Sequence, residues 1–290
     1  MVSCVDDGTE GISDYCSISP SITGSKADTK SSGSTITSIF QEVIGCAITI
    51  AVEISSLVFS TVIFLSGCKD REKFNYYGLN PSKLTEEQLN LPAIIFFHAI
   101  KHNQSGALPI ARALQNRKIK NAAYTINVVY NETHPEKHQQ EIDRQIRQIS
   151  KKYFDQGKPC QIIAVGHSLG GIEAMDLALI RQGNGAPIIA KVIAGVTIAS
   201  RLKVVPAKWP RACHPELQPQ VNAVNKAIRS NPSIPFCTIA ARRDWKVPSE
   251  AVLVAPKNQC HVINNCSHVS VYFMPETHRK AIDFIESINK

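Results

Sequence analysis

The chain has 290 residues, of which 43% are hydrophobic, so it can form one sizeable domain with extensions. Its formal net charge of +8 is moderate, and its lysines and arginines are spread along the chain. No basic segment is interleaved with aromatic residues, so the sequence gives no indication of nucleic-acid binding.

The first 68 residues divide into a polar and an apolar part. Residues 1–37 are rich in Ser, Thr, Gly and Asp without any periodicity, which predicts disorder. Residues 38–68 contain the apolar run VIGCAITIAVEISSLVFSTVIFL (43–65), which is long enough to span a bilayer as a helix. Glu53 near its centre costs about 2.5–3.5 kcal/mol, whereas each apolar residue contributes about −0.3 to −0.6 kcal/mol. The sum favours a transmembrane or membrane-associated helix; a soluble buried or surface helix is the alternative.

The flanking residues bear on localisation. Lys69, Arg71 and Lys73 closely follow the apolar run, which favours a single-pass anchor with a cytoplasmic C-terminal part. A cleaved signal peptide fits poorly, because the run starts near residue 39 and is too long. LSGC (65–68) resembles a bacterial lipoprotein processing site, but it would leave a very long leader.

From about residue 91, short apolar runs alternate with helical patterns within an expected domain at 69–290. Strands are expected at 93–98, 121–131, 161–166, 190–200, 234–241 and 260–264, and helices at 105–117, 134–156, 169–183 and 275–290. This alternation predicts the α/β class, with a mostly parallel sheet covered by helices on both faces. The proline-containing segment 201–233 does not follow the alternation of strands and helices, and it is either a lid or an ordinary surface insertion.

The pentad GHSLG (166–170) fits the pattern G-x-S-x-G. Such a match occurs by chance in about one chain of this size in ten, so its context decides. An apolar strand is expected before it and a helix after it, which together predict a nucleophile elbow with Ser168 as the nucleophile. Glycines avoid clashes in so tight a turn, and the helix N-terminus favours developing negative charge. A glycine-rich turn with an incidental serine is the alternative.

A serine nucleophile needs a base and an acid that orients the base. Asp244 follows one expected strand and His268 follows the last one, in the chain order serine, acid, histidine. His261 is a weaker base candidate because it opens its strand, and Asp176 is a weaker acid because it lies on the helix after Ser168. A loop aspartate paired with neighbouring arginines, and a surface histidine, are the alternatives.

Stabilisation of an oxyanion requires two backbone N–H groups. Leu169, directly after the serine, is expected to supply one. Ile100, in the loop after the strand at 93–98, is expected to supply the other.

The segments IIFFHAIKHNQSGALPIARAL, AVGHSLGG, ARRDWKVP and CSHVS together resemble the α/β-hydrolase superfamily, in particular its small lipase- and esterase-like members. The likeness covers about residues 91–290. It implies an α/β-hydrolase fold with Ser168 as nucleophile, His268 as base and Asp244 as orienting acid. The family usually has His-Gly in the oxyanion loop, whereas this chain has His98-Ala99, and alanine resists positive φ.

No cofactor or metal is expected. The nine cysteines contain no CxxC and are expected to be reduced, although Cys260 and Cys266 are close enough to pair in an oxidising compartment. HPEKH (134–138) spaces two histidines like a zinc-protease motif but has Pro135 where that motif has Glu. A metal cluster of Cys260, His261, Cys266 and His268 is a remote alternative.

The sequence therefore predicts a serine carboxylic-ester hydrolase that forms an acyl-enzyme and acts on a small-molecule or lipid ester, in association with a membrane. Two alternatives stay open. One is acyl transfer to an alcohol other than water. The other is a catalytically silent, membrane-tethered binding module, which Ala99 supports.

Overall fold

The computed structural model describes residues 32–67, 78–100, 104–128, 130, 135–181, 190–203, 217–230 and 234–290. Three regions of interest lie outside these ranges: residues 1–31, which are expected to be disordered, the cations at 69–73, and residues 204–216 and 231–233 of the proline-containing segment. Within the segment 201–233, the structure describes a helix, α7 (Gln218–Ser230), and the choice between a lid and a surface insertion stays open.

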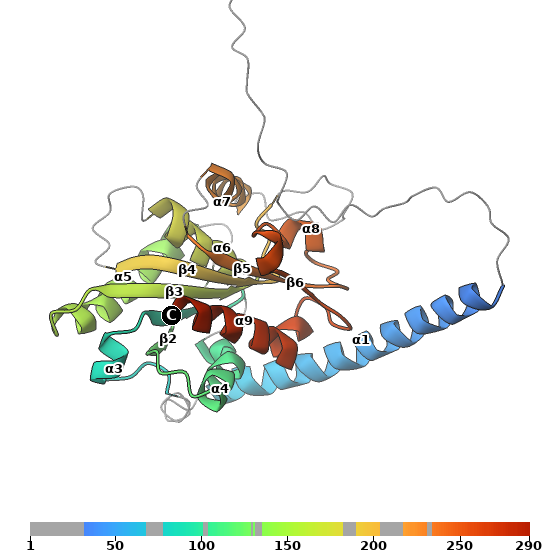
Figure 1. Cartoon of the computed structure of the whole chain (residues 1–290), viewed down its shortest axis with the longest axis horizontal. Coiled ribbons are helices and arrows are strands. Elements are labelled where there is room, and N and C mark those ends of the chain that lie inside the picture. Colours follow the sequence, from blue (N-terminus) through green and yellow to red (C-terminus); the bar gives the residue numbers. More distant parts are fainter. Residues whose placement is uncertain are drawn as a thin grey trace, which may run out of the picture.

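Six parallel strands form one sheet in the order β2-β1-β3-β4-β5-β6 (Figure 1). They are β1 (Ala93–Phe97), β2 (Ala123–Thr125), β3 (Cys160–His167), β4 (Ala190–Ile198), β5 (Phe236–Ala241) and β6 (Cys260–Ile263). β1 and β5 are buried along their whole length, because helices cover both faces of the sheet. This confirms the predicted α/β class. β2 is much shorter than its expected span of 121–131.

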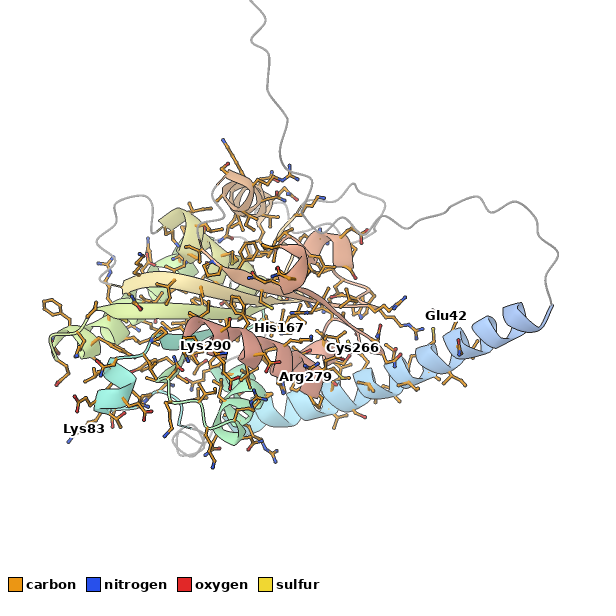
Figure 2. All side chains as sticks on the ribbon, in the orientation of Figure 1. Glu42, Lys83, His167, Cys266, Arg279 and Lys290 are labelled. Atoms are coloured by element: carbon orange, nitrogen blue, oxygen red, sulfur yellow. The ribbon has the colours of Figure 1, made fainter. Side chains whose placement is uncertain are left out.

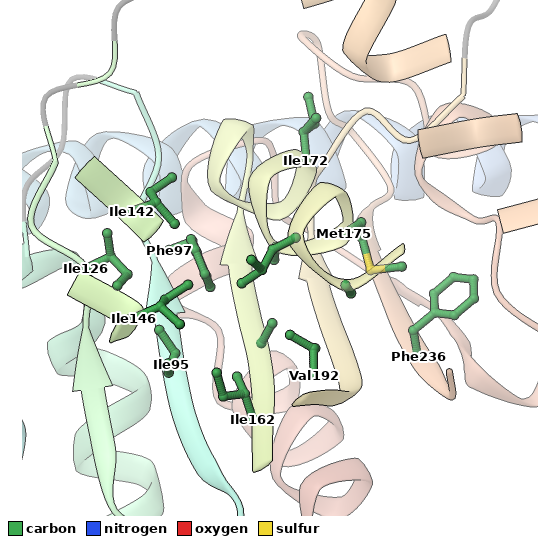
Figure 3. Close-up of a cluster of buried hydrophobic side chains, with 14 of the residues drawn as sticks. Ile95, Phe97, Ile126, Ile142, Ile146, Ile162, Ile172, Met175, Val192 and Phe236 are labelled. Carbon is green, nitrogen blue, oxygen red and sulfur yellow. The ribbon is translucent and has the colours of Figure 1, made fainter. Parts of the chain in front are cut away.

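One face of the sheet carries α5 (Pro135–Phe154), α6 (Leu169–Asp176) and α7. Figure 3 shows the core on this side, where Ile142 and Ile146 lie close to Ile95 and Phe97. The opposite face carries α4 (Leu108–Asn116) and α9 (Pro275–Ile288), whose apolar side chains form a second core (Figure 1). The sheet therefore lies between two layers of helices, with one core on each face.

Several shorter elements complete the described chain. α3 (Glu86–Leu89) begins with a capping box at Thr85, and α8 (Ser249–Val252) follows β5. Short 3₁₀ turns are η1 (Gln104–Ala107), η4 (Lys257–Gln259) and η5 (Ser270–Phe273). The helix expected at 169–183 ends as α6 at Asp176 and continues as a π-turn, η2 (Leu177–Arg181); its expected end at Gly183 lies outside the described residues.

The strand order reverses between β1 and β3. From β1 the chain moves outward to β2 at the edge, whereas from β3 it moves the other way to β4. The connections that leave the carboxyl ends of β1 and β3 therefore run in opposite directions along the sheet. This is the point where open α/β sheets bind ligands.

The apolar segment near the N-terminus forms one long helix, α1 (Ser32–Gly67). It begins at Ser32, so the last residues of the stretch expected to be disordered are helical. By length and composition, the window Gln41–Val58 is apolar enough to cross a membrane, with a mean hydropathy of 1.5. In Figure 1, α1 runs beside the domain and reaches α4. It packs against η1 and η5.

Candidate active site

Ser168 lies at the turn between β3 and α6, with φ 54° and ψ −122°. Non-glycine residues rarely occupy this backbone region, so the surrounding structure has to hold the turn in place. One support is the Ser168 N–H group, which donates to the carbonyl oxygen of Ile198 at 2.9 Å. The side chain stands, half-buried, at the carboxyl end of the sheet.

The start of α6 packs directly on the end of β1. A Cβ added to Gly170 would lie 2.2 Å from the carbonyl oxygen of Phe97 and 2.5 Å from that of His98. A Cβ at Gly166 would lie 2.3 Å from the carbonyl oxygen of Gly170. These atoms belong to the backbone and cannot rotate away, so only glycine fits at either position. The turn that holds Ser168 is thereby pressed against the loop after β1.

His268 and Asp244 reach Ser168 from the loops after β6 and β5. The Nε2 atom of His268 is 2.9 Å from Ser168 Oγ, and its Nδ1 atom is 2.8 Å from Asp244 Oδ2. Both His268 and Asp244 are buried. A carboxylate accepts hydrogen bonds, so Nδ1 carries the proton and Nε2 can accept the one from the serine hydroxyl. The structure thus brings the three sequence-predicted side chains into one hydrogen-bonded chain.

The carboxylate of Asp244 is held from its other side. Its Oδ1 atom accepts the backbone N–H groups of Lys246 and Val247, both at 2.8 Å. The neighbouring arginines, proposed from the sequence as alternative partners of Asp244, bind elsewhere: Arg242 donates to Asn264 and Arg243 pairs with Glu42. Asp244 is therefore oriented towards His268.

His167 supports His268, a contact that the sequence reasoning missed. Its Nε2–H group donates to the carbonyl oxygen of His268 at 3.1 Å. Its ring stacks on Tyr272, with the ring centroids 4.7 Å apart and the planes 18° from parallel. His167 is the second residue of the G-x-S-x-G pentad, a position that the pattern leaves free to be any residue. The sequence around it therefore gives no indication of this contact.

The loop after β1 contains Ile100, one of the two expected oxyanion donors, and Ala99, which stands where the family usually has glycine. Ala99 is buried, and it does not belong to the described non-glycine residues with positive φ, so the expected conflict with alanine does not arise. The neighbouring His98 donates from Nδ1 to the Ala99 carbonyl oxygen at 2.9 Å. Ile100 is half-buried and packs against the core on the α5 and α6 side.

The weaker catalytic candidates have other surroundings. His261 is a half-buried residue of β6, where burial lowers its pKa. Asp176 ends α6, and its Oδ2 atom lies 2.8 Å from Arg181 Nε. Burial raises the pKa of Asp176 to about 6. Among the described residues, Ser168 Oγ contacts His268 and hydrogen-bonds neither of these side chains.

The cysteines that the structure describes form no disulfide bonds with one another. Cys260 Sγ donates to the carbonyl oxygen of Ala255, and Cys266 Sγ donates to that of Ile263, so these two do not pair with each other. Within the described ranges, no group of three or more His, Cys, Asp or Glu side chains is arranged to hold a metal ion. His134, from the HPEKH segment, lies outside those ranges.

No protein-family model and no curated protein sequence matches the chain. Several solved structures resemble it. A gene product from Listeria innocua is 15% identical with a TM-score of 0.47, covering 68% of this chain and 94% of its own. A putative hydrolase of the α/β superfamily from Xanthomonas campestris is 10% identical with a TM-score of 0.43, covering 68% and 98%. A carboxylesterase, CesB, from Bacillus subtilis is 15% identical with a TM-score of 0.45, covering 70% and 85%.

Proposed function

We propose that this chain is a serine carboxylic-ester hydrolase of the α/β-hydrolase type. One observation carries the proposal: Ser168 Oγ, the His268 imidazole and the Asp244 carboxylate are joined by contacts of 2.9 and 2.8 Å. A serine on a strained turn, a base that accepts its proton and a buried acid that orients the base are the parts that acyl transfer requires.

The reaction begins when Ser168 Oγ attacks the ester carbonyl carbon while His268 Nε2 takes the hydroxyl proton. Asp244 holds the imidazole in the required tautomer and stabilises the imidazolium. The tetrahedral intermediate breaks its bond to the alcohol oxygen, which receives the proton from His268 and departs. A water molecule then attacks the acyl carbon while His268 Nε2 takes one of its protons. The bond from the acyl carbon to Ser168 Oγ breaks, Oγ receives that proton from His268, and the carboxylic acid is released.

The negative charge on the tetrahedral oxygen needs two N–H donors. We propose the backbone N–H groups of Leu169 and Ile100. Leu169 is the first residue of α6, where the helix leaves its N–H groups without an internal partner and its dipole favours an anion. The close packing of Gly170 on the end of β1 supports the pairing, because it draws the loop containing Ile100 towards this helix end.

Labelling with a fluorophosphonate probe tests the nucleophile. The wild-type chain is expected to become labelled and to hydrolyse p-nitrophenyl acetate, whereas Ser168→Ala does neither. Ser287→Ala is a matched control, because this serine lies on α9 and its hydroxyl donates to the carbonyl oxygen of Phe284, away from the candidate site. Equal labelling of the wild type and Ser168→Ala would exclude the proposed nucleophile. A folded wild type that is neither labelled nor active would favour the silent binding module, and ester formation with an added alcohol would favour an acyltransferase.

We also propose that α1 brings the enzyme to a membrane, which would suit lipid ester substrates. The support is its exposed apolar side, which includes Val43, Ile44, Ile48, Ile50, Ile54, Leu57 and Val58. The helix also contacts the domain through the same window that could span a bilayer. That contact favours α1 lying along the membrane surface over the single-pass anchor expected from hydropathy alone.

Vesicle binding tests this second proposal. Ile50→Glu with Ile54→Glu is expected to abolish co-sedimentation with phosphatidylcholine–phosphatidylserine vesicles, since both side chains are about 60% exposed on α1. Phe154→Glu is the matched control, because Phe154 is 68% exposed but lies at the end of α5. Alkaline extraction separates the two arrangements, as it releases a surface-bound helix and leaves a spanning one in the membrane. Unchanged co-sedimentation of the α1 variant would exclude membrane binding through this face.

A further inference from the structure

Helix α1 turns its polar side, not its apolar side, towards the catalytic domain. In the window Gln41–Val58, the least exposed residues are Gly45, Thr49, Val52, Glu53 and Ser56, whereas the remaining positions are mostly exposed. The spacing of these five residues places them on one stripe of the helix. Four of these five residues are small and three are polar, and such a stripe on a mostly apolar helix indicates specific contacts with the domain.

Glu53 makes one of these contacts at the loop that carries the base. Its Oε2 atom accepts the backbone N–H of Ser270 at 3.1 Å. Ser270 is fully buried and lies two residues after His268, and its Oγ atom accepts the N–H of Ser267 at 2.8 Å. The bond between Ser267 and Ser270 forms a turn that contains His268. The carboxylate of Glu53 binds this turn at its last residue.

Arg243 makes the second contact at the loop that carries the acid. Its guanidinium donates to Thr49 Oγ1 at 3.3 Å and pairs with Glu42 at 2.9 Å. Arg243 directly precedes Asp244 in the chain. A Cβ added to Gly45 would lie 2.8 Å from the same guanidinium, so glycine provides the room for it. Figure 2 shows Glu42 on the part of α1 that lies farther from α4.

The third contact is with the loop after β1. α1 packs against η1, which follows the loop of Ile100, and against η5, which begins at Ser270. α1 therefore contacts segments that follow β1, β5 and β6, which are three of the four strands whose ends form the candidate site.

From these contacts we propose that α1 is a positioning element of the active site, in which Glu53 holds the base loop and Arg243 ties the acid loop to the same helix. The proposal rests on the proposed function of Ser168, His268 and Asp244. Glu53 touches no reacting atom. It acts through the Ser270 N–H group, for which it is the acceptor. Without this acceptor, the turn that places the imidazole next to Ser168 would lose one of its anchors.

The test compares three full-length variants by the second-order rate of fluorophosphonate labelling. Glu53→Gln keeps an oxygen that accepts the Ser270 N–H, and it is expected to label within about twofold of wild type. Glu53→Met keeps the length of the side chain without an acceptor, and it is expected to label about tenfold more slowly, as for one lost hydrogen bond to a charged group. Ser55→Ala is the control on the same helix, because Ser55 is exposed and its hydroxyl donates to the carbonyl oxygen of Ala51 within α1.

A Glu53→Met variant that labels like the wild type would overturn the proposal, as would a Glu53→Gln variant that slows as much as Glu53→Met. Hydrogen exchange provides a measurement that does not depend on whether Glu53→Met folds. The Ser270 amide should be protected in the wild type and in Glu53→Gln, and fast exchange of that amide in the folded wild type would also overturn the proposal. Failure of the proposed function is distinguishable, because the wild type itself would then not be labelled at Ser168.

Discussion

The substitution Asp244→Asn tests how the acid controls the base. Asparagine has the same shape as aspartate but replaces one carboxylate oxygen with an NH₂ group. The N–H groups of Lys246 and Val247 both point at the Oδ1 position, at 2.8 Å. The flipped orientation would place NH₂ against two donors, so the amide oxygen has to occupy that position and the NH₂ group has to face His268.

This orientation reverses the proton arrangement of the imidazole. The Nδ1 atom of His268, 2.8 Å from the altered group, can only accept from an NH₂ donor, so its proton moves to Nε2. An Nε2 atom that carries a proton cannot take another one from Ser168. We expect kcat to fall about 1,000- to 10,000-fold, which corresponds to about 4 to 5.5 kcal/mol of transition-state stabilisation.

The assay is the initial rate of p-nitrophenyl acetate hydrolysis, with Ser168→Ala as the background. Asp283→Asn on α9 serves as the matched control, because Asp283 is largely exposed and pairs with Arg117 at the surface. Urea unfolding shows whether the variant remains folded. If folded Asp244→Asn keeps more than about a tenth of the wild-type kcat, the assignment of Asp244 as the orienting acid is refuted.

Two further predictions concern stability. Gly171→Ala is expected to lower the free energy of unfolding by about 1–3 kcal/mol, because the new Cβ would lie 1.9 Å from Ser200 Oγ. In urea unfolding, the double variant Gly171→Ala with Ser200→Gly should recover most of this loss. A Gly171→Ala variant as stable as the wild type would contradict the close contact between these two residues. Burial raises the pKa of Asp176 from 3.8 to about 6, so the native state holds this proton more tightly than the unfolded chain. Stability should therefore fall as the pH rises between these values, by at most about 1.4 kcal/mol per pH unit, and Asp176→Asn should remove that slope. An unchanged slope in the variant would show that another group is responsible.

The fold class and the position of Ser168 could be predicted from sequence because their signals are local. Continuous apolar runs such as that of β3 arise because a covered parallel strand is buried on both faces. The glycines around Ser168 are required by contacts within a few residues or with the adjacent strand. In a parallel sheet, all carboxyl ends meet at one edge, so residues that follow different strands can be expected near each other. Asp244 and His268 each follow such a strand, so their place beside Ser168 could be predicted from the sequence.

The distances themselves required the tertiary structure. Ser168 and His268 are 100 residues apart in sequence, and their contact depends on the packing of every element between them. The stacking of His167 on Tyr272 and the two N–H groups that hold Asp244 also depend on how loops from different strands come together. No residue type or spacing encodes such contacts locally.

Helix α1 shows most clearly the difference between what the local sequence predicts and what the tertiary structure decides. Its composition alone determined that it would be a long apolar helix, since hydropathy and helix length are sums over neighbouring residues. The same sum counts Glu53 only as a cost of insertion. The fold places that carboxylate 3.1 Å from an N–H group 217 residues further along the chain. Which side of a helix meets the domain is decided by the shape and polarity of a surface that exists only once the chain has folded.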